Sequence, residues 1–325
     1  MIMPEITVKL DQFDKKLLYF LDRDSKADLS ILAKKLNRSK PFVLYRMRRL
    51  EQEGVLTSYT AIVDMSKLGY FTFRVYFKFQ QMTKDALQQV VEHVRTSLTQ
   101  VWTITTMHGK WDLALFLGVR SIAEFHTIWD SIMLRYKDHI KAYNVAVYAP
   151  IYNFNRAFFI ETNEEPLTRV YGDGEKEDID TLDQRIIEAY APNARATAVD
   201  IAKKLGISSD TVRNRIKKLE QRKIIVGYKI GLDLEKLGFV SFRVDLQLRS
   251  TKRNRELFEF CRMHPNIYQI NNTIGGADFE IEVIVRDTNH LFEVIDELKT
   301  RFTDVINDAD SFGFSTFHIL AFIPD

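Results

Sequence analysis

The sequence is poor in cysteine, in long apolar runs and in net charge. Cys261 is the single cysteine among 325 residues, which excludes an internal disulfide and leaves no basis for a cysteine-rich zinc site. No apolar stretch approaches the ~18–20 residues that a bilayer crossing needs, and the N-terminus has no basic segment followed by an apolar run. Hydrophobic residues make up 46% of the chain, which excludes a disordered protein. We therefore expect a cytoplasmic globular protein with no membrane partner.

The net charge is only +2, from 46 basic and 44 acidic side chains. That total alone argues against a nucleic-acid-binding protein, which usually carries a basic patch. The charge is unevenly distributed, however. Residues 26–60 hold eight basic and three acidic side chains, and residues 195–229 hold ten and three. The rest of the chain is therefore net acidic, and the two basic windows are candidates for DNA contact.

The chain is an internal repeat. Leu32–Leu36 (LAKKL) reappears as Ile201–Leu205 (IAKKL) at an offset of 169 residues. This offset holds without a gap from about residue 10 to about residue 80, and it changes to 166 after a small deletion in the second copy. Matching pairs include Arg46 with Arg215, Tyr59 with Tyr228 and Arg74 with Arg243. The length therefore corresponds to two copies of one unit.

The first part of each unit predicts three helices, of which the third begins at Ser39 or Ser208 as N-cap. The break before it contains Asn37 in one copy and Gly206 in the other, and both residue types tolerate the left-handed conformation of a tight turn. Two helices, a short turn and a third helix with a basic outer face are typical of a helix-turn-helix. The β-rich segments 55–64 and 224–233 predict the hairpin of a wing.

The third helix of a helix-turn-helix lies in the major groove, so its outer face supplies the candidate DNA contacts. Amide and guanidinium groups there read adenine and guanine or bind phosphate. The predicted DNA-binding residues are Ser39, Lys40, Phe42, Tyr45, Arg46 and Arg49 in the first copy and Ser208, Ser209, Thr211, Asn214, Arg215 and Lys218 in the second. The alternative is that the charges form only a solvated helix face. Since the two sets differ, we expect an asymmetric or imperfectly palindromic DNA site.

The second part of each unit predicts strands and helices in the order βαββαβ, which is the ferredoxin-like order. Such a sheet covers one face with helices and often packs the other against a second sheet. The predicted fold class is α+β: two winged helix-turn-helix domains alternate with two ferredoxin-like domains in an internal tandem duplication. The polar segment between the copies, punctuated by glycine and proline, predicts a linker. The domain boundaries are 1–65, 66–160, 161–177 (linker), 178–234 and 235–325.

Four motifs together resemble the Lrp/AsnC (leucine-responsive regulatory protein, feast/famine) family of transcription regulators. They are the openings Leu10–Asp14 and Ile179–Asp183, the pattern Ser-x-x-x-Val-x-x-Arg in the third helix, Leu-Gly before the sheet, and the Gly-x-x-Asp turns that begin at Gly109 and Gly275. Family members are usually single units that dimerise. The resemblance therefore implies that this chain forms its own pseudo-dimer and self-associates through its ferredoxin-like domains.

In that family the ferredoxin-like (RAM) domain binds small effectors, often amino acids, near the Gly-x-x-Asp turn. The effector-binding residues that the resemblance implies are His108, Gly109, Asp112, Gly275, Gly276 and Asp278. The alternative is that the glycines only form a tight turn and the aspartate only caps it. We expect no cofactor other than such an effector. We also expect no metal site, because the histidines lack metal-ligand spacing.

The resemblance implies a regulator that binds specific sequences of double-stranded DNA and is not an enzyme. The enzymatic alternative is a siroheme decarboxylase, because these enzymes use a similar two-part fold. They need a basic, histidine-lined tetrapyrrole pocket, and we expect no repeated His/Arg cluster on the sheets. A third possibility is a degenerate regulator that acts only through protein contacts. In that case the first copy, with Phe42 and Tyr45 on its outer face, is the weaker DNA reader.

Overall fold

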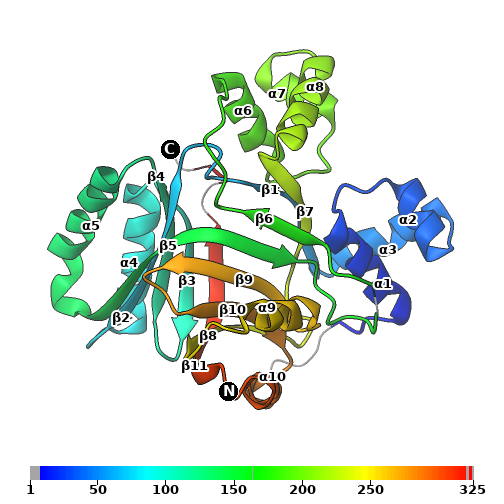
Figure 1. The fold of residues 1–325 in the computed structure, drawn as a ribbon. Coiled ribbons are helices and arrows are strands. Elements are labelled where there is room, and N and C mark those ends of the chain that lie inside the picture. Colours follow the sequence, from blue (N-terminus) through cyan, green and yellow to red (C-terminus); the bar gives the residue numbers. More distant parts are fainter. Residues whose placement is uncertain (1–7, 163, 320–321, 324–325) are drawn as a thin grey trace.

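The computed structural model describes residues 8–162, 164–319, 322 and 323, and it shows two helical heads attached to one large sheet (Figure 1). Head 1 consists of α1 (Gln12–Arg23), α2 (Leu29–Leu36) and α3 (Lys40–Gln52), followed by strand β1 (Leu56–Val63). Head 2 consists of α6 (Thr181–Tyr190), α7 (Ala198–Leu205) and α8 (Ser209–Gln221), followed by β7 (Ile225–Leu232). The two helix-turn-helix units are therefore present.

The turns of both heads follow the predicted local chemistry. Asn37 and Gly206 end the second helices in the left-handed conformation, with φ of 51° and 71°. Ser39 and Ser208 are the N-caps of the third helices, and each accepts a hydrogen bond from a backbone N–H three residues later, at 3.4 and 3.1 Å. These positions depend only on residues close in sequence, which is why the sequence predicts them.

The predicted wing hairpins are wrong. Each β-rich segment forms one strand, and β1 pairs with β7 in an antiparallel two-stranded sheet. Thr60 lies opposite Lys229, its counterpart at the offset of 169, so the pseudo-two-fold axis passes through this pair. Ile230 of β7 belongs to the core of head 1, and Ala61 of β1 belongs to the core of head 2. Each head is thus completed by the strand of the other copy, because a lone hairpin would bury less apolar surface.

The two ferredoxin-like domains have the predicted order of elements. The first contains β2 (Phe71–Phe79), α4 (Lys84–Ser97), β3 (Val101–His108), β4 (Leu113–Val119), α5 (Ile122–Tyr136), the short 3₁₀ helix η1 (Lys137–His139) and β5 (Ile140–Phe154). The second contains β8 (Val240–Leu248), α9 (Asn254–Met263), β9 (Ile267–Ile274), β10 (Phe279–Val285), α10 (Thr288–Arg301) and β11 (Ile306–Ile319). The segment predicted as linker contains β6 (Thr168–Tyr171), which pairs with β5.

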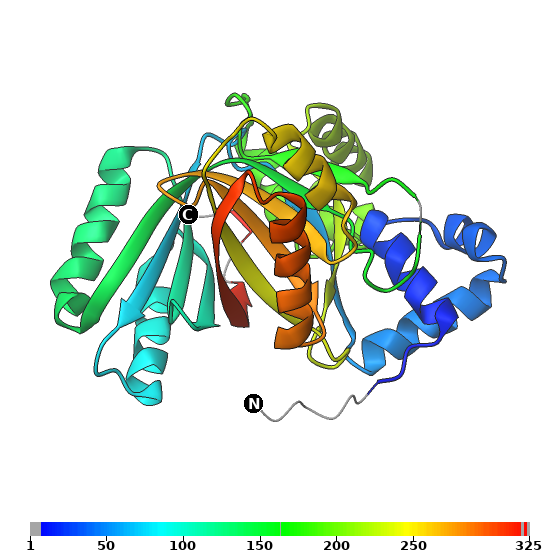
Figure 2. The same ribbon diagram turned by 60° about the horizontal axis from the view of Figure 1, so that its bottom comes forward.

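The two four-stranded sheets join into one closed ring. Their strand orders are β5-β2-β4-β3 and β11-β8-β10-β9, and the pairs β3–β11 and β5–β9 connect them. The helices cover the outside, α4 and α5 on one sheet and α9 and α10 on the other (Figure 2). The inner faces of the sheets therefore face each other, as the prediction of a second packed sheet requires. None of the helices in the described part of the chain combines the length and apolarity that a membrane crossing requires.

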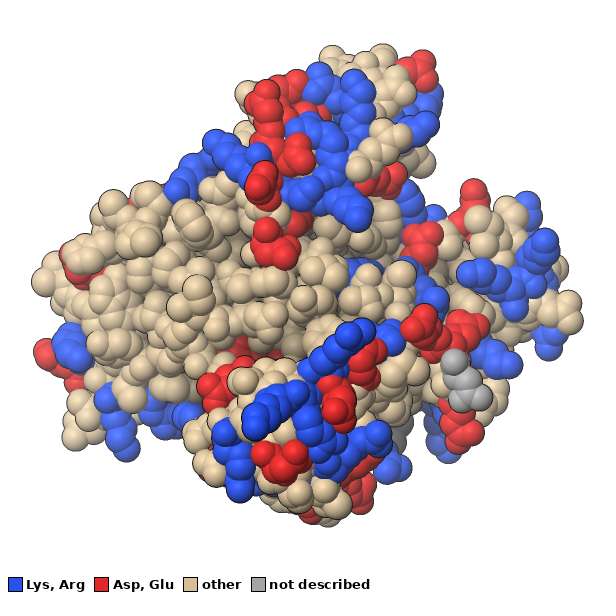
Figure 3. Space-filling model, in the orientation of Figure 1, with Lys and Arg blue, Asp and Glu red and all other residues tan. Residues whose placement is uncertain are grey.

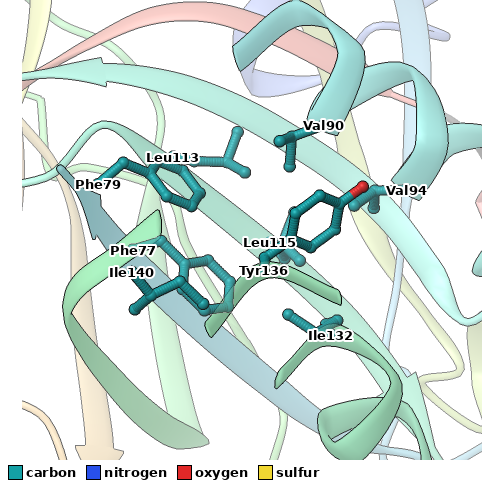
Figure 4. A pocket seen from close by; sticks show the side chains of 9 residues that line it. All are labelled: Phe77, Phe79, Val90, Val94, Leu113, Leu115, Ile132, Tyr136 and Ile140. Carbon is teal, nitrogen blue, oxygen red and sulfur yellow. The ribbon is translucent and has the colours of Figure 1, made fainter. Parts of the chain in front are cut away.

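The first ferredoxin-like domain is packed less tightly than the second. α10 buries four apolar side chains, whereas α5 buries only Ile128 and Ile132. A cavity of about 10 Å³ remains between α4, α5 and the sheet, and apolar side chains such as Phe77, Val90 and Val94 line it (Figure 4). This volume is at the lower limit for a single water molecule, so the cavity is a packing defect and not a ligand site.

Candidate DNA-binding heads and the pocket between the sheets

The third helix of each head buries one stripe and exposes the other. In α3, Val43, Met47 and Leu50 are buried, and in α8 Val212 and Leu219 are buried. The outward side chains are Lys40, Tyr45 and Arg48 in head 1 and Asn214, Lys217 and Lys218 in head 2. Figure 3 shows Lys and Arg on both heads and also over α9 and α10 at the bottom of the view, with Asp and Glu among them, while the sheet surface in between carries little charge. Each head thus carries basic side chains on the exposed face of its third helix.

Arg46 and Arg215 do not lie on the outer face, contrary to the expectation from helical spacing. Arg46 pairs with Asp11 and, from Nε at 2.9 Å, with the buried Asp14, and only 12% of its side chain is exposed. Its counterpart Arg215 lies 2.5 Å from Asp180 and 3.1 Å from Asp183. Both guanidinium groups hold the third helix to the first. The paired aspartates at the start of each head therefore have a structural role.

The electrostatics of head 2 agree with this arrangement. The backbone N–H of Asp183 and the guanidinium of Arg215 lower the pKa of Asp180 below its usual range. The carboxylate therefore stays charged at neutral pH and remains an ion-pair partner for Arg215. A phosphate group would have to compete with it for the same guanidinium.

Other predicted DNA contacts are also engaged within the heads. Arg49 pairs with Asp14 and lies 3.6 Å from Glu53. The Phe42 ring packs edge-on against Phe13 at 5.0 Å between centroids, and the Thr211 hydroxyl lies 2.8 Å from that of Ser208. Ser39 and Ser208 serve as caps, and Ser209 is half-buried. Of the predicted residues, Lys40, Tyr45, Asn214 and Lys218 have exposed side chains that point away from the heads.

The two heads contact each other through equivalent residues, a pattern the sequence analysis missed. Lys26 of head 1 pairs with Glu220 of head 2 and lies 4.3 Å from the Tyr228 ring centroid. Its counterpart Arg195 lies 5.2 Å from the ring centroid of Tyr59. This reciprocal contact is what a two-fold interface requires. The heads therefore contact each other directly, and the sequence signal for this contact was the matching pair Tyr59 and Tyr228.

A pocket of about 250 Å³ lies between the two sheets. Its lining consists largely of residues that are equivalent in the two copies, so it lies on the pseudo-two-fold axis. The first copy supplies Tyr76, Lys110, Trp111 and Asn144, and the second supplies Asp245, Gln247, Gly276, Ala277, Asp278 and Asp310. The pocket is chemically asymmetric, with aromatic side chains on one side and three carboxylates on the other.

Two of the predicted effector-binding residues, Gly276 and Asp278, line this pocket, and His108, Gly109, Asp112 and Gly275 do not. Asp112 accepts a hydrogen bond at 2.8 Å from the backbone N–H of Phe79, and Asp278 accepts one at 2.8 Å from that of Leu248. Phe79 and Leu248 are equivalent residues of the two copies. Gly109 and Gly275 have φ of 104° and 88°, which explains glycine there. The structure therefore gives these turns the capping role, and the effector role of the six residues stays a prediction.

The pocket also contains a buried hydroxyl group that lacks a hydrogen bond. The Tyr76 side chain is 1% exposed, and its hydroxyl has no hydrogen-bond partner among the described residues. Burial raises the pKa of Tyr76, so the group is a neutral donor and acceptor. A buried polar group without a partner costs free energy, so this hydroxyl is a candidate hydrogen-bonding group for a polar ligand.

Behind the pocket lies a buried charge cluster. Arg74 donates two hydrogen bonds of 2.9 Å to Glu280, which also pairs with Arg243. Arg243 further contacts Asp245 at 3.0 Å and Glu282 at 3.2 Å. The sequence analysis expected no repeated His/Arg cluster on the sheets, and the structure adds that one arginine is repeated there, because Arg74 and Arg243 are equivalent residues on β2 and β8. Both are neutralised by carboxylates of the second copy.

Comparison with known proteins agrees with this architecture. The family model for the AsnC-type helix-turn-helix domain matches residues 179–220, and the one described as winged helix-turn-helix DNA-binding matches residues 10–57. The transcriptional regulator LrpA of Pyrococcus horikoshii is 48% identical over 126 residues, which cover 36% of this chain and 83% of LrpA. The regulator AldR of Mycolicibacterium smegmatis is 27% identical over 140 residues, 42% of this chain and 82% of AldR.

Two solved structures of the siroheme decarboxylase NirDL extend over both copies. The one in complex with an iron-uroporphyrin III analogue has a TM-score of 0.62, 14% sequence identity and coverage of 96% of this chain and 95% of that one. At this identity the likeness establishes the fold alone, including the tandem arrangement of the two units. The sequence relatives, by contrast, are regulators. The chain therefore belongs to the Lrp/AsnC family of transcription regulators, with two complete units of the family in a single polypeptide.

Proposed function

We propose that the protein is a transcription regulator that binds specific DNA sequences with two non-identical heads. The observation that carries this proposal is the pair of exposed third helices, which present different side chains from two heads held in contact. Head 2 offers Asn214, whose amide fits the N6 and N7 edge of adenine, and head 1 offers Lys40 and Tyr45. The difference between the heads favours an asymmetric DNA site.

In vitro site selection followed by binding measurements on single variants tests this proposal. Asn214→Ala is expected to weaken specific binding by about 1–3 kcal/mol and to relax base preference at one position only. Lys40→Ala, a phosphate contact, is expected to weaken all sequences similarly and to reduce the salt slope by about one. Lys252→Ala, an exposed position on the second ferredoxin-like domain, is the matched control. A selected motif with perfect two-fold symmetry would contradict the proposal of unequal heads.

A second proposal concerns the effector. We propose that one small molecule with a cationic amino group, such as an amino acid, binds per chain in the pocket between the sheets. Asp245 pairs with Arg243 and Asp310 pairs with Lys110, so Asp278 is the carboxylate that favours a cation. Trp111 offers an apolar surface, and the Tyr76 hydroxyl offers a hydrogen bond. The pocket volume of about 250 Å³ is below the range for drug-sized ligands and suits a smaller molecule.

Calorimetric titration of the protein with the twenty amino acids tests the effector proposal. A single site per chain is expected, and Tyr76→Phe, which removes only the hydroxyl, is expected to weaken it about tenfold by loss of one hydrogen bond. Tyr45→Phe on head 1 is the matched control. If no amino acid binds, or if Tyr76→Phe leaves affinity unchanged, the pocket is not the effector site.

The protein is further proposed to act without catalysis, since a carboxylate-lined pocket does not suit a polycarboxylate tetrapyrrole. An absorbance titration with iron-uroporphyrin tests this, and a stoichiometric spectral shift would favour the decarboxylase alternative. The two sheets pair with each other within one chain, and we propose that this pairing replaces the dimer contact that the family resemblance implies. Further self-association between chains stays a prediction, which sedimentation velocity over a concentration series tests.

A further inference from the structure

We infer that two arginines, Arg156 just after β5 and Arg169 on β6, insert between head 1 and β7 and thereby set the spacing of the two heads on DNA. We call this pair the arginine insert. The inference rests on the proposed DNA-binding function, but its geometric part is testable without DNA. It assigns a positioning role to residues far from both third helices.

Head 2 touches the outer edge of β1 directly. The backbone N–H of Ala61 donates to the carbonyl of Ala191 at 3.0 Å. The backbone N–H of Ala194 donates to the carbonyl of Tyr59 at 2.7 Å. Main chain therefore meets main chain on this side, and one hydrogen bond separates head 2 from the two-stranded sheet.

The outer edge of β7 contacts arginine side chains, whereas that of β1 contacts main-chain groups. The counterparts of Ala191 and Tyr59 at the offset of 169 are Asp22 and Tyr228. Their two carbonyls both accept hydrogen bonds from Nη2 of Arg169, the one to Tyr228 at 2.7 Å. Arg156 bonds the carbonyl of Ile230 on the same edge. Arginine side chains thus occupy the place that main-chain contacts occupy on the other side.

The arginine insert is built into the protein core. Arg169 is 2% exposed, and Arg156 pairs with the carboxylate of Asp22, which is 1% exposed. Gly227 on β7 leaves the necessary room, because a Cβ atom there would lie 2.9 Å from Cδ of Arg169. The counterpart of Gly227 on the other strand is Ser58, which has a side chain. Glycine at position 227 therefore leaves the space that the Arg169 side chain occupies.

The consequence is unequal placement of the heads. Nη2 of Arg169 lies between the carbonyls of Asp22 and Tyr228, whereas on the other side backbone N–H groups meet backbone carbonyls directly. The link between head 1 and β7 is therefore longer at this point by at most one hydrogen-bond length, about 3 Å. That distance is close to the rise of one base pair, about 3.4 Å. We therefore expect the preferred spacing of the half-sites to differ by about one base pair from the spacing that symmetric heads would select.

Two variants with a matched control test the inference. Arg169→Met removes the hydrogen bonds while keeping a long side chain, and Gly227→Ser places a side chain where Arg169 lies. Ser58→Gly alters the equivalent position on β1, away from the arginine insert, and is the control. Cysteines introduced at the equivalent positions Lys40, which is exposed, and Ser209, which is half-buried, carry spin labels. Pulsed electron resonance between the two labels reports the distance between the heads.

Arg169→Met and Gly227→Ser are expected to change the mean distance between the heads, and Ser58→Gly is expected to leave it unchanged. In site selection, the two variants should shift the preferred half-site spacing by about one base pair. Loss of thermal stability with the same distance and the same spacing would mean that the arginine insert is merely structural and would overturn the inference. If the parent protein selects no DNA, the proposed function fails, while the distance measurement still decides the geometric part.

Discussion

The buried carboxylate of Glu280 offers the sharpest test of what holds the two sheets together. Glu280→Ala removes the partner that accepts both Arg74 hydrogen bonds, at 2.9 Å each. Arg74 is 1% exposed, so its charge has no access to solvent after the change. Removing one member of a buried ion pair costs about 3–5 kcal/mol, because the other charge is left uncompensated. For a chain of 325 residues the unfolding entropy is about 0.7 kcal/mol/K, so this loss corresponds to a fall in Tm of roughly 4–7 °C.

Urea unfolding followed by tryptophan fluorescence measures this loss, since Trp111 lies in the adjoining pocket. The decisive comparison is the double variant Arg74→Met/Glu280→Leu, which removes both charges and keeps apolar volume. Arg243 retains Asp245 and Glu282 in that variant. The double variant is therefore expected to lose much less stability than Glu280→Ala alone, and Arg74→Met alone should lie between them.

One result would refute this reasoning. If the double variant is as unstable as Glu280→Ala, the cost comes from lost packing and not from an unpaired charge. The same conclusion would follow if Glu280→Gln, which keeps the size of the side chain and one acceptor, were fully stable. In either case the cluster would not act through its charges.

Three further predictions concern stability. Burial lowers the pKa of Lys229 to about 8, so the unfolded state binds the proton more tightly than the folded state. The free energy of unfolding should therefore rise as the pH is raised from 8 to about 10.5. Lys229→Thr, which introduces the residue found at the equivalent position 60, should flatten that rise in urea midpoints measured across this range. Val94→Ile should fill the cavity between α4 and α5 and add about 0.5–1 kcal/mol in urea unfolding, whereas Val283→Ile in the close-packed second domain should destabilise. Gly206→Ala, in open space at φ 71°, should lower the unfolding free energy by about 1–2 kcal/mol, and Gly275→Ala should lower it more because its Cβ would lie 2.5 Å from a backbone carbonyl oxygen.

Features that depend on neighbours in sequence were predictable. The caps at Ser39 and Ser208, the left-handed turns at Asn37 and Gly206, and the βαββαβ order all follow from local residue types and periodicity. The outward position of Asn214 likewise follows from helical spacing. The inward position of Arg46 does not, because a long side chain at the boundary of a face goes wherever its ion-pair partner lies.

The sequence by itself determined that the chain is two copies of one regulator unit, that each copy has a helix-turn-helix, and that basic charge collects on the heads. Only the tertiary structure decided that β1 and β7 pair across the copies, that the sheets close into a ring, and that Arg169 separates head 1 from β7. The physical reason is distance along the chain. Local patterns record which residues a short segment buries, whereas pairing between segments more than a hundred residues apart depends on all surfaces that compete for the same partner.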